Sequence, residues 1–226
     1  MKNTPPLRPA SLFESETPRR RRARMRRILD ALAARYPAAA CALLHENPFQ
    51  LLIATILSAQ CTDARVNMVT PVLFAKYPDV HAMAEAPVEN IADIIRSTGF
   101  FQNKSKNIKA CCLAIRERHG GTVPRTMEEL TALPGVGRKT ANVVLGNAFG
   151  VPGFPVDTHV RRIANLLQLT DSENPDRIEE HLCAITPTAE WTDASHRLIL
   201  HGRETCIARR PRCEECIIRS HCPSAG

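Results

Sequence analysis

The sequence predicts an all-α protein, on three observations. Aromatic residues make up only 4% of the chain, and no segment alternates β-branched and polar residues as a half-buried strand does. Signals for the start of a helix recur at short intervals. The segments between them carry apolar side chains at helical spacing, with no repeat of fixed period. A chain of 226 residues with these features has room for a sizeable core in one or two domains.

The start signals combine an N-cap residue with a proline at the first helical position. Asn47 precedes Pro48, with Gln50 as capping-box partner, and Asn174 precedes Pro175 in the same way. The connections are short and contain Pro or Gly, as helix-to-helix turns in compact domains do. The predicted helices are 24–34, 48–59, 62–76, 88–97, 103–118, 126–131, 138–148, 157–168, 175–184 and 190–204.

The chain lacks the apolar segment that a membrane span or a secretory signal needs. Its most continuous apolar run, 49–59, is 11 residues long, whereas a span needs about 20. A helix that is apolar nearly all round is expected at the centre of a core. No apolar stretch follows the N-terminal basic residues, so we expect a soluble intracellular protein.

The excess positive charge lies entirely in the N-terminal part of the chain. Residues 1–27 carry nine basic and two acidic side chains, a net charge of +7, and the rest of the chain is neutral. Like charges at this density repel one another, so we expect 1–24 to be a disordered basic arm that binds a polyanion. A solvated or targeting tail is the alternative, although Glu14 and Glu16 fit a mitochondrial presequence poorly.

A glycine-rich turn separates two predicted helices at 133–142, which reads LPGVGRKTAN. Pro134 ends the first helix, and Gly135 and Gly137 permit positive φ and leave room for a close backbone approach. The second helix opens at Arg138, and its unpaired amides and its dipole form a natural anion site. The pattern predicts a helix-hairpin-helix whose backbone amides bind a DNA phosphate without reading the sequence. The alternative is an ordinary corner between two helices.

Two nucleotide-binding motifs do not fit this turn. Thr140 stands where the dinucleotide fingerprint needs a third glycine, and Arg138 separates the last glycine from Lys139, unlike in a P-loop. Asp157 follows 18 residues after Lys139 and opens the next predicted helix. A lysine and a carboxylate on a DNA-binding face are the minimum set for attack on a glycosidic carbon. Asp157 can also serve as an N-cap, and Lys139 as a phosphate contact.

The nine cysteines fall into two groups. Five are scattered among apolar residues, as reduced buried thiols are, whereas four lie within 17 residues near the C-terminus. These four have the spacing Cys-x6-Cys-x2-Cys-x5-Cys, and four thiolates hold either a zinc ion or a [4Fe–4S] cluster. Three arginines within the ligand loop would contact phosphates. The predicted ligands are Cys206, Cys213, Cys216 and Cys222, and the arginines are Arg209, Arg210 and Arg212.

From about residue 25 to the C-terminus, the sequence resembles the endonuclease III family of DNA glycosylases with lyase activity. Four stretches carry the resemblance, and the cysteine spacing is typical of the iron–sulfur members of that superfamily. These stretches are Leu57–Asp63, Leu133–Asn142, Val156–Val160 and Leu198–Gly202 with the cysteines after it.

The resemblance implies a two-domain helix-hairpin-helix glycosylase fold. A six-helix barrel, about 41–151, would carry the hairpin, and a cluster domain, 25–40 plus 152–226, would carry the cysteines and Asp157. The two domains would flank a groove, with the hairpin and Asp157 on opposite lips. The implied cofactor is a [4Fe–4S] cluster that orders the basic loop. The implied partner is damaged double-stranded DNA, bound by a monomer in the bacterial cytoplasm, at the nucleoid.

The same resemblance assigns roles at the site. Lys139 would attack the sugar of an extruded nucleotide and form a Schiff base, and Asp157 would accept the proton. A lysine must lose its proton before it attacks, which loss of hydration and the neighbouring Arg138 would favour. Gln60 would fill the space that the base leaves, and Phe100 would wedge into the stack where a Leu is common. The predicted DNA contacts of the hairpin are Gly135, Val136, Gly137 and Arg138.

The implied activity is that of a bifunctional DNA glycosylase/AP lyase of base excision repair, which removes oxidised pyrimidines and cuts the strand by β-elimination. One alternative is a monofunctional glycosylase that removes adenine from mispairs, a family that normally lacks a lysine at the position of Lys139 and the Thr158-His159 pair after the aspartate. A second alternative is a non-catalytic DNA-binding paralogue. The sequence departs from the family pattern at Cys61, where a smaller Ala is frequent, and in the arginine-rich arm.

Overall fold

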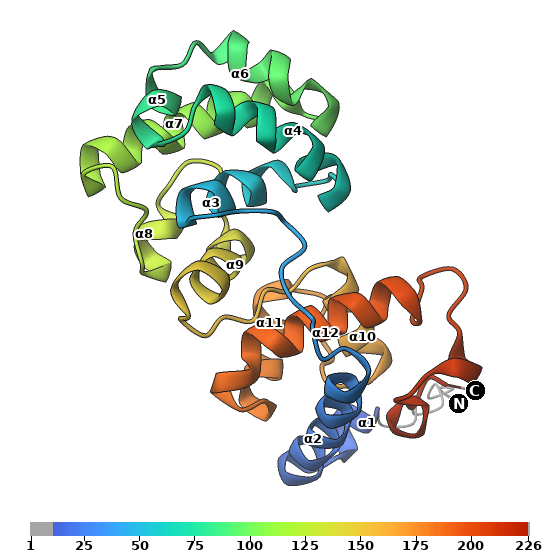
Figure 1. The fold of residues 1–226 in the computed structure, drawn as a ribbon. Helices are drawn as coiled ribbons and strands as arrows, with labels where there is room; N and C mark the ends of the chain where they lie inside the picture. Colours follow the sequence, from blue (N-terminus) through green and yellow to red (C-terminus); the bar gives the residue numbers. More distant parts are fainter. Residues whose placement is uncertain (1–10, 226) are drawn as a thin grey trace, which may run out of the picture. The chain divides into compact units, whose positions relative to one another are not determined.

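The computed structural model describes residues 11–225, which form helices joined by short connections, with no β-strand among them (Figure 1). The predicted all-α fold class is therefore confirmed. None of these helices has the length and apolar content to cross a membrane. The α-helices are α1 (Leu12–Ser15), α2 (Pro18–Arg35), α3 (Pro48–Leu57), α4 (Asp63–Lys76), α5 (Val80–Glu85), α6 (Val88–Ile95), α7 (Phe101–His119), α8 (Met127–Thr131), α9 (Arg138–Phe149), α10 (Thr158–Leu166), α11 (Pro175–Ile185) and α12 (Trp191–Glu204). The short 3-10 helices are η1 (Arg96–Thr98), η2 (Thr188–Glu190), η3 (Cys213–Glu215) and η4 (Arg219–His221).

Every helix predicted from the sequence is present, and two α-helices, α1 and α5, were not predicted. Helix α5 has six residues, too few to show helical periodicity. Its start signal is Asp79, whose side chain accepts a hydrogen bond from the amide of Ala82 at 2.8 Å. A capping residue alone is therefore enough to start such a helix when the core supplies the rest.

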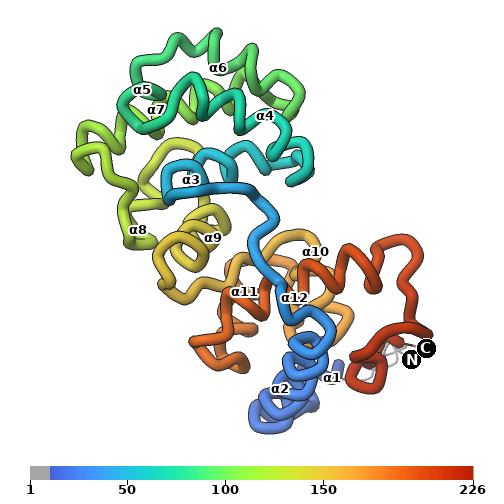
Figure 2. The backbone as a smooth tube through the Cα atoms, in the orientation of Figure 1, coloured from blue at the N-terminus to red at the C-terminus, as the bar shows by residue number. Residues whose placement is uncertain are grey.

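The chain divides into two units. One unit is Ala40–Pro155 and contains α3 to α9. The other combines the residues before Ala40 with those from Val156 onward, so that it is built from both ends of the chain. Figure 2 follows this path, from α2 through α3 to α9 and back to α10, α11 and α12.

Helix α3 lies at the centre of the unit Ala40–Pro155. Eight of its ten residues are buried, and it packs against α9, α4 and α7. The hydroxyl of Thr55 donates to the carbonyl of Leu51 at 2.7 Å, which satisfies a polar group in this apolar surrounding. The prediction of a central buried helix over 48–59 is confirmed, and α3 provides the surface against which α9 packs.

The second unit is held together by α10, α12 and α2. Helix α12 packs against both α10 and α2, and α11 packs against the same two helices. Gly202 allows the close approach of α12 to α10, since a Cβ atom at this position would lie 2.9 Å from Cβ of His159.

The N-terminal residues differ from the predicted disordered arm 1–24. Residues 11–24 form α1 and the first turns of α2, and 1–10 lie outside the described residues. Two carboxylates neutralise part of the charge: Glu16 lies 2.8 Å from Arg24, and Glu190 accepts from both terminal nitrogens of Arg26 at 2.6 and 3.0 Å. The other face of α2 is apolar and fully buried, through Met25, Ile28, Leu29 and Leu32. Local charge repulsion is thus overcome by acids elsewhere in the unit and by an apolar helix face.

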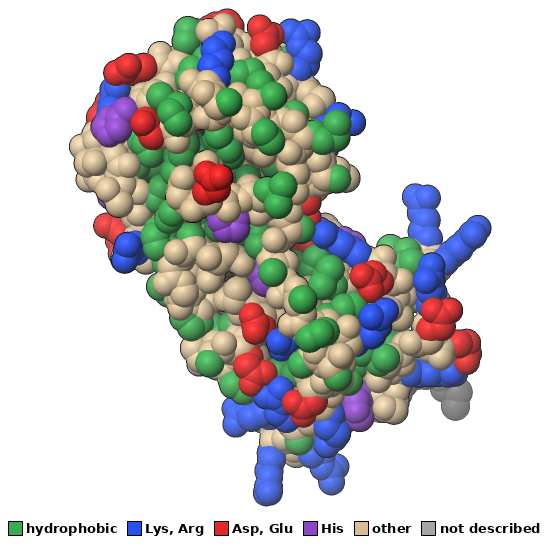
Figure 3. Space-filling view, in the orientation of Figure 1, with side chains coloured by type: hydrophobic (Ala, Val, Ile, Leu, Met, Phe, Trp, Pro, Cys, Tyr) green, Lys and Arg blue, Asp and Glu red, His purple; other side chains and the backbone are tan. Residues whose placement is uncertain are grey.

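Four arginines in residues 18–27 of α2 are exposed, and none of them forms an ion pair with an acidic side chain of residues 11–225. Figure 3 shows Lys and Arg side chains gathered over the N-terminal part of α2 and over the loop after α12. These arginines are Arg19, Arg20, Arg22 and Arg27.

Candidate functional site

The turn between α8 and α9 is tied to the core by its apolar residues. Leu133 and Val136 are 3% and 6% exposed, and the amide of Val136 donates to the carbonyl of Leu133 at 3.1 Å. Gly135 has φ +76°, and a Cβ atom there would lie 2.8 Å from Cβ of Asn107 in α7. The turn therefore requires glycine at position 135, for its backbone conformation and for space.

Gly137 does not use the positive φ that glycine permits, since its φ of −96° belongs to an extended backbone. A Cβ atom at this position would meet nothing within 4 Å. Gly137 is the N-cap of α9, and no side chain caps the helix. The first amides of α9 thus lie next to open space, where a ligand backbone could approach closely.

Arg138 and Lys139 form the first turn of α9, and both side chains are exposed. The predicted loss of hydration around Lys139 is not supplied by the protein itself. A bound ligand would have to remove water from this amine.

Asp157 is the N-cap of α10. One carboxylate oxygen, Oδ1, accepts from the amides of His159 and Val160, both at 2.8 Å. The structural role considered for Asp157 is confirmed, and it leaves Oδ2 outside both of these hydrogen bonds. Asp157 and Lys139 belong to different units of the chain.

Gln60 and Phe100 share an uncommon backbone conformation. They have φ +51° and +46°, and Gln168 is the only other non-glycine residue with positive φ in the part of the chain that the structure describes. Such residues cost free energy and concentrate at functional sites. Phe100 is 66% exposed, whereas the neighbouring Phe101 packs against the core, so Phe100 is the ring available for contact with a ligand.

Lys104, which sequence reasoning missed, joins the loops that carry Gln60 and Phe100. It is 5% exposed, and its amine donates to the carbonyls of Leu57 and Thr98, each at 2.8 Å. Burial lowers the pKa of Lys104, and the nearby thiol of Cys61 opposes this. The available signal was the helical spacing from Lys104 to the apolar residues four and eight positions later, which places the lysine on the buried face.

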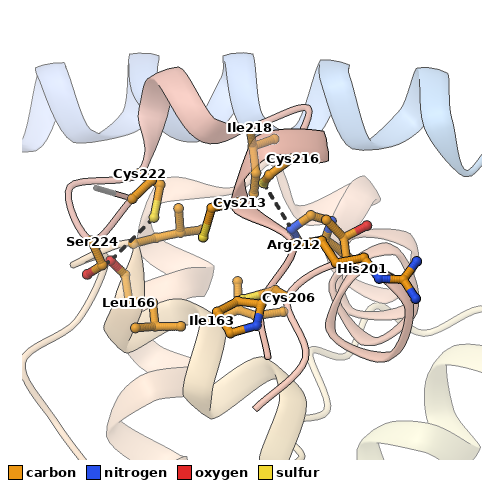
Figure 4. Close-up of a pocket in the computed structure, with 14 residues that line it drawn as sticks. Ile163, Leu166, His201, Cys206, Arg212, Cys213, Cys216, Ile218, Cys222 and Ser224 are labelled. Atoms are coloured by element: carbon orange, nitrogen blue, oxygen red, sulfur yellow. Dashed lines mark hydrogen bonds between the residues drawn. The ribbon is translucent and has the colours of Figure 1, made fainter. Parts of the chain in front are cut away.

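The four predicted cysteine ligands line one cavity of about 80 Å³ (Figure 4). Burial raises the pKa of Cys206 and of Cys216, so these thiols need a metal to hold them as thiolates. Among residues 11–225 no three His, Cys, Asp or Glu side chains lie close enough together to hold one metal ion. Four sulfur donors around a shared cavity fit a cluster with an iron for each thiolate better than a single zinc ion. The predicted ligands are Cys206, Cys213, Cys216 and Cys222.

Two further side chains support the ligand loop and were not predicted. Arg162 of α10 donates to the carbonyls of Gly202 and Cys206 at 2.9 and 2.6 Å. His201 is 1% exposed, and its Nε2 lies 3.6 Å from the sulfur of Cys216. Burial lowers the pKa of His201 to about 4, so the ring is neutral at physiological pH. The apolar spacing of α12 placed this histidine on the buried face.

The arginines of the ligand loop all lie on the protein surface. Arg209, Arg210 and Arg212 are exposed, and Arg212 lies 4.0 Å from Glu215. The amide of Arg212 donates to the carbonyl of Thr205 at 2.9 Å, which closes the base of the loop. This hydrogen bond brings the two ends of the basic loop together.

Two family models match the chain. One, described as HhH-GPD superfamily base excision DNA repair protein, matches residues 53–187 and so includes the glycine turn and Asp157. The other, described as the iron-sulfur binding domain of endonuclease III, matches residues 206–222, from the first to the last predicted ligand.

Known proteins resemble the chain over most of its length. Endonuclease III of Synechocystis sp. is 53% identical over 199 residues, which cover 88% of this chain and 91% of that protein. A solved non-covalent endonuclease III–DNA complex and a trapped endonuclease III–DNA covalent intermediate each match with a TM-score of 0.87 and 45% identity. Both matches cover 90% of this chain and 96% of the solved chain.

We predict different costs for alanine at the two glycines of the turn. Gly135→Ala should lower the free energy of unfolding by at least about 2 kcal/mol, because of its positive φ and the contact with Asn107. Gly137→Ala should cost less than about 1 kcal/mol, since its conformation suits any residue. Urea denaturation of both variants measures this, and equal losses would contradict the geometry of the turn.

Proposed function

The chain belongs to the HhH-GPD superfamily of base excision DNA repair proteins and, within it, to the endonuclease III family, and on this basis we propose how its residues carry out DNA repair. It is a DNA glycosylase with AP lyase activity and carries a [4Fe–4S] cluster. Its substrate is damaged duplex DNA, and the proposed lesions are oxidised pyrimidines. The proposed form is a monomer in the bacterial cytoplasm, associated with the nucleoid.

Lys139 is the proposed nucleophile. Its amine attacks the anomeric carbon of the extruded nucleotide, the base leaves, and the resulting Schiff base acidifies the adjacent sugar carbon, so that β-elimination cuts the strand. The observation that carries this proposal is the position of Lys139: it is exposed on the first turn of α9, directly behind an uncapped glycine turn. DNA bound on that turn removes water from the amine.

Asp157 is the proposed proton acceptor. Its Oδ1 is committed to the amides at the start of α10, which fixes the orientation of the carboxylate, and Oδ2 remains for the proton of the amine and for the cationic sugar. One carboxylate thus combines a structural and a chemical role.

The amides at the start of α9 are proposed to bind one DNA phosphate, with Gly135, Val136, Gly137 and Arg138 as the contact residues. Open space beside Gly137 supports this, because a side chain there would keep the phosphate away from the backbone. The arginines of the ligand loop, Arg209, Arg210 and Arg212, are proposed to contact phosphates as well.

Gln60 and Phe100 are the proposed residues that enter the base stack when the nucleotide leaves it. The exposed ring of Phe100 and the left-handed backbone of both residues support this. Lys104 keeps their two loops together, since its buried amine bonds to both. The energy of unstacking is lowest for a damaged base, which favours lesions over intact DNA.

The same residues bear differently on the two alternatives. A monofunctional adenine glycosylase does not need Lys139 and normally lacks the Thr158-His159 pair, and this chain has both. A non-catalytic DNA-binding paralogue would use Lys139 only as a phosphate contact.

We predict that Lys139→Ala abolishes the covalent adduct that borohydride traps on abasic-site DNA. Affinity for a lesion duplex should change less than about fivefold, because an exposed charge contributes at most about 1 kcal/mol. Lys106→Ala, which removes another exposed lysine of the same unit, is the control and should be trapped like the wild type. An adduct with Lys139→Ala would place the nucleophile elsewhere.

Substitutions of Asp157 should separate its two roles. Asn caps helices as well as Asp, so Asp157→Asn should keep the free energy of unfolding within about 0.5 kcal/mol, whereas Asp157→Ala should lose about 1 kcal/mol. Both should lower the rate of base removal by about 10² to 10⁴. Single-turnover kinetics and urea denaturation measure the two effects. A fully active Asp157→Asn variant would leave Asp157 with the capping role alone.

The exposed arginines of α2 should contribute to DNA affinity without contributing to chemistry. For Arg19→Gln/Arg20→Gln we expect a shallower plot of the logarithm of the binding constant against the logarithm of the salt concentration. The magnitude of its slope should fall by about 0.9 for each DNA phosphate that the variant no longer neutralises, while single-turnover rates stay unchanged. The control, Arg35→Gln/Arg177→Gln, removes arginines that already pair with Glu204 and Glu180. Equal salt slopes in both variants would exclude this face of α2 from the DNA interface.

A further inference from the structure

The segment 11–24, which we call the N-terminal strap, packs against the part of the chain that holds the last cysteine ligand. It consists of α1 and the first turns of α2, and belongs to the same unit as the four cysteines. The basic composition predicted a free arm here. The structure instead buries one of its arginines between the strap, the end of α10 and η4.

Arg24 connects these three elements. It is 6% exposed, and its Nη1 donates to the carbonyl of Leu167 at 2.7 Å and to the carbonyl of His221 at 3.3 Å. Its Nη2 donates to the carbonyl of Gln168 at 3.4 Å. His221 directly precedes the ligand Cys222, so Arg24 fixes the backbone next to that ligand.

The carbonyls involved need such donors because they end a helix. The last carbonyls of an α-helix have no partner within the helix, and a cation near them is stabilised by the helix dipole. At the end of α10, Arg24 donates to the carbonyl of Leu167, and the hydroxyl of Ser224 donates to the carbonyl of Leu166 at 2.8 Å. Leu166, Leu167 and Cys222 also line the cavity of the cysteines (Figure 4). The end of α10 therefore forms a wall of the cluster site.

Glu16 makes the burial of Arg24 possible. The side chains of Arg24 and Glu16 are 7% and 9% exposed, with hydrogen bonds from Nε and Nη2 of Arg24 to the carboxylate at 3.1 and 2.8 Å. A buried guanidinium without a carboxylate is costly, so the pair acts as one unit.

Helix α1 contacts both Gln168, just after α10, and helix α11. The amide of Leu12 donates to Oε1 of Gln168 at 2.6 Å, and the ring of Phe13 lies 5.0 Å from the ring of His181. Gln168 has φ +49°, the third left-handed non-glycine residue of the described chain. Both its side chain and its carbonyl bond to the strap, which helps to hold this conformation.

We propose that the N-terminal strap, through Arg24 and Glu16, positions the loop of Cys222 and slows the loss of the iron–sulfur cluster. Arg24 is a positioning residue, since it acts through the backbone beside the ligand. The proposal rests on the presence of the [4Fe–4S] cluster and is independent of the roles of Lys139 and Asp157. Supporting groups around metal ligands typically change retention of the metal by about 10- to 100-fold.

The test measures release of iron to a chelator and bleaching of the visible absorption of the cluster, in the full-length protein well below its melting temperature. Iron and sulfide analysis confirms the loading of each sample beforehand. We expect Arg24→Met and Glu16→Gln to release iron at least about tenfold faster than the wild type. Arg20→Met, the same change at an exposed arginine of α2, should release iron at the wild-type rate.

A second control separates positioning from general loss of stability. Leu32→Ala removes a fully buried side chain further along α2 and leaves Arg24 in place. It should lower the melting temperature yet retain iron better than Arg24→Met. Wild-type release rates in Arg24→Met, or equally fast release in Leu32→Ala, would overturn the proposal. Arg24→Met that still holds its full iron and sulfide content should remove bases at the wild-type rate. This measurement separates a failure of the strap proposal from a failure of the catalytic assignment.

Discussion

The unpaired amides at the start of a helix are the constraint on which the proposed chemistry depends. Helices α9 and α10 meet this constraint in opposite ways. At α10 the carboxylate of Asp157 accepts from two amides and is thereby fixed in place. At α9 no side chain caps the helix, and the amides beside Gly137 remain open to an anion. One helix start thus orients an acid, and the other leaves open amides for the proposed phosphate contact, with Lys139 next to them.

Buried positive charge has a comparable role in each of the two units. Lys104 joins the ends of α3 and η1, and Arg24 joins the strap, α10 and η4. Each cation donates to carbonyls that regular helices leave without a partner. The three non-glycine residues with positive φ in the described chain, Gln60, Phe100 and Gln168, all lie in loops that these cations hold. Backbone strain among residues 11–225 is therefore found where a buried cation supports it.

Features set by local chemistry could be predicted from the sequence, and those set by distant partners could not. The helix starts, the central helix α3, the glycine turn and the cysteine spacing follow from residues a few positions apart, and the structure and family matches confirm them. The order of 11–24 depends on contacts with the end of α10 and with His221, far along the chain, so counting local charges predicted the opposite. Both glycines of the turn permit a positive φ, but only Gly135 adopts one, because the sequence does not say which of the two the turn needs in that conformation. Lys104 was missed because lysines mostly lie on the surface, although its spacing from the apolar residues of α7 places it on the buried face.

The central claim is that the amine of Lys139 bonds to deoxyribose. The most direct measurement is to reduce the complex of the wild-type protein with an abasic-site duplex, digest it and locate the modified peptide by mass spectrometry. The account predicts a single modified residue, Lys139, in the peptide that follows the glycine turn. A modification at Lys104, Lys106 or Lys109, or at the N-terminal amine, would contradict it.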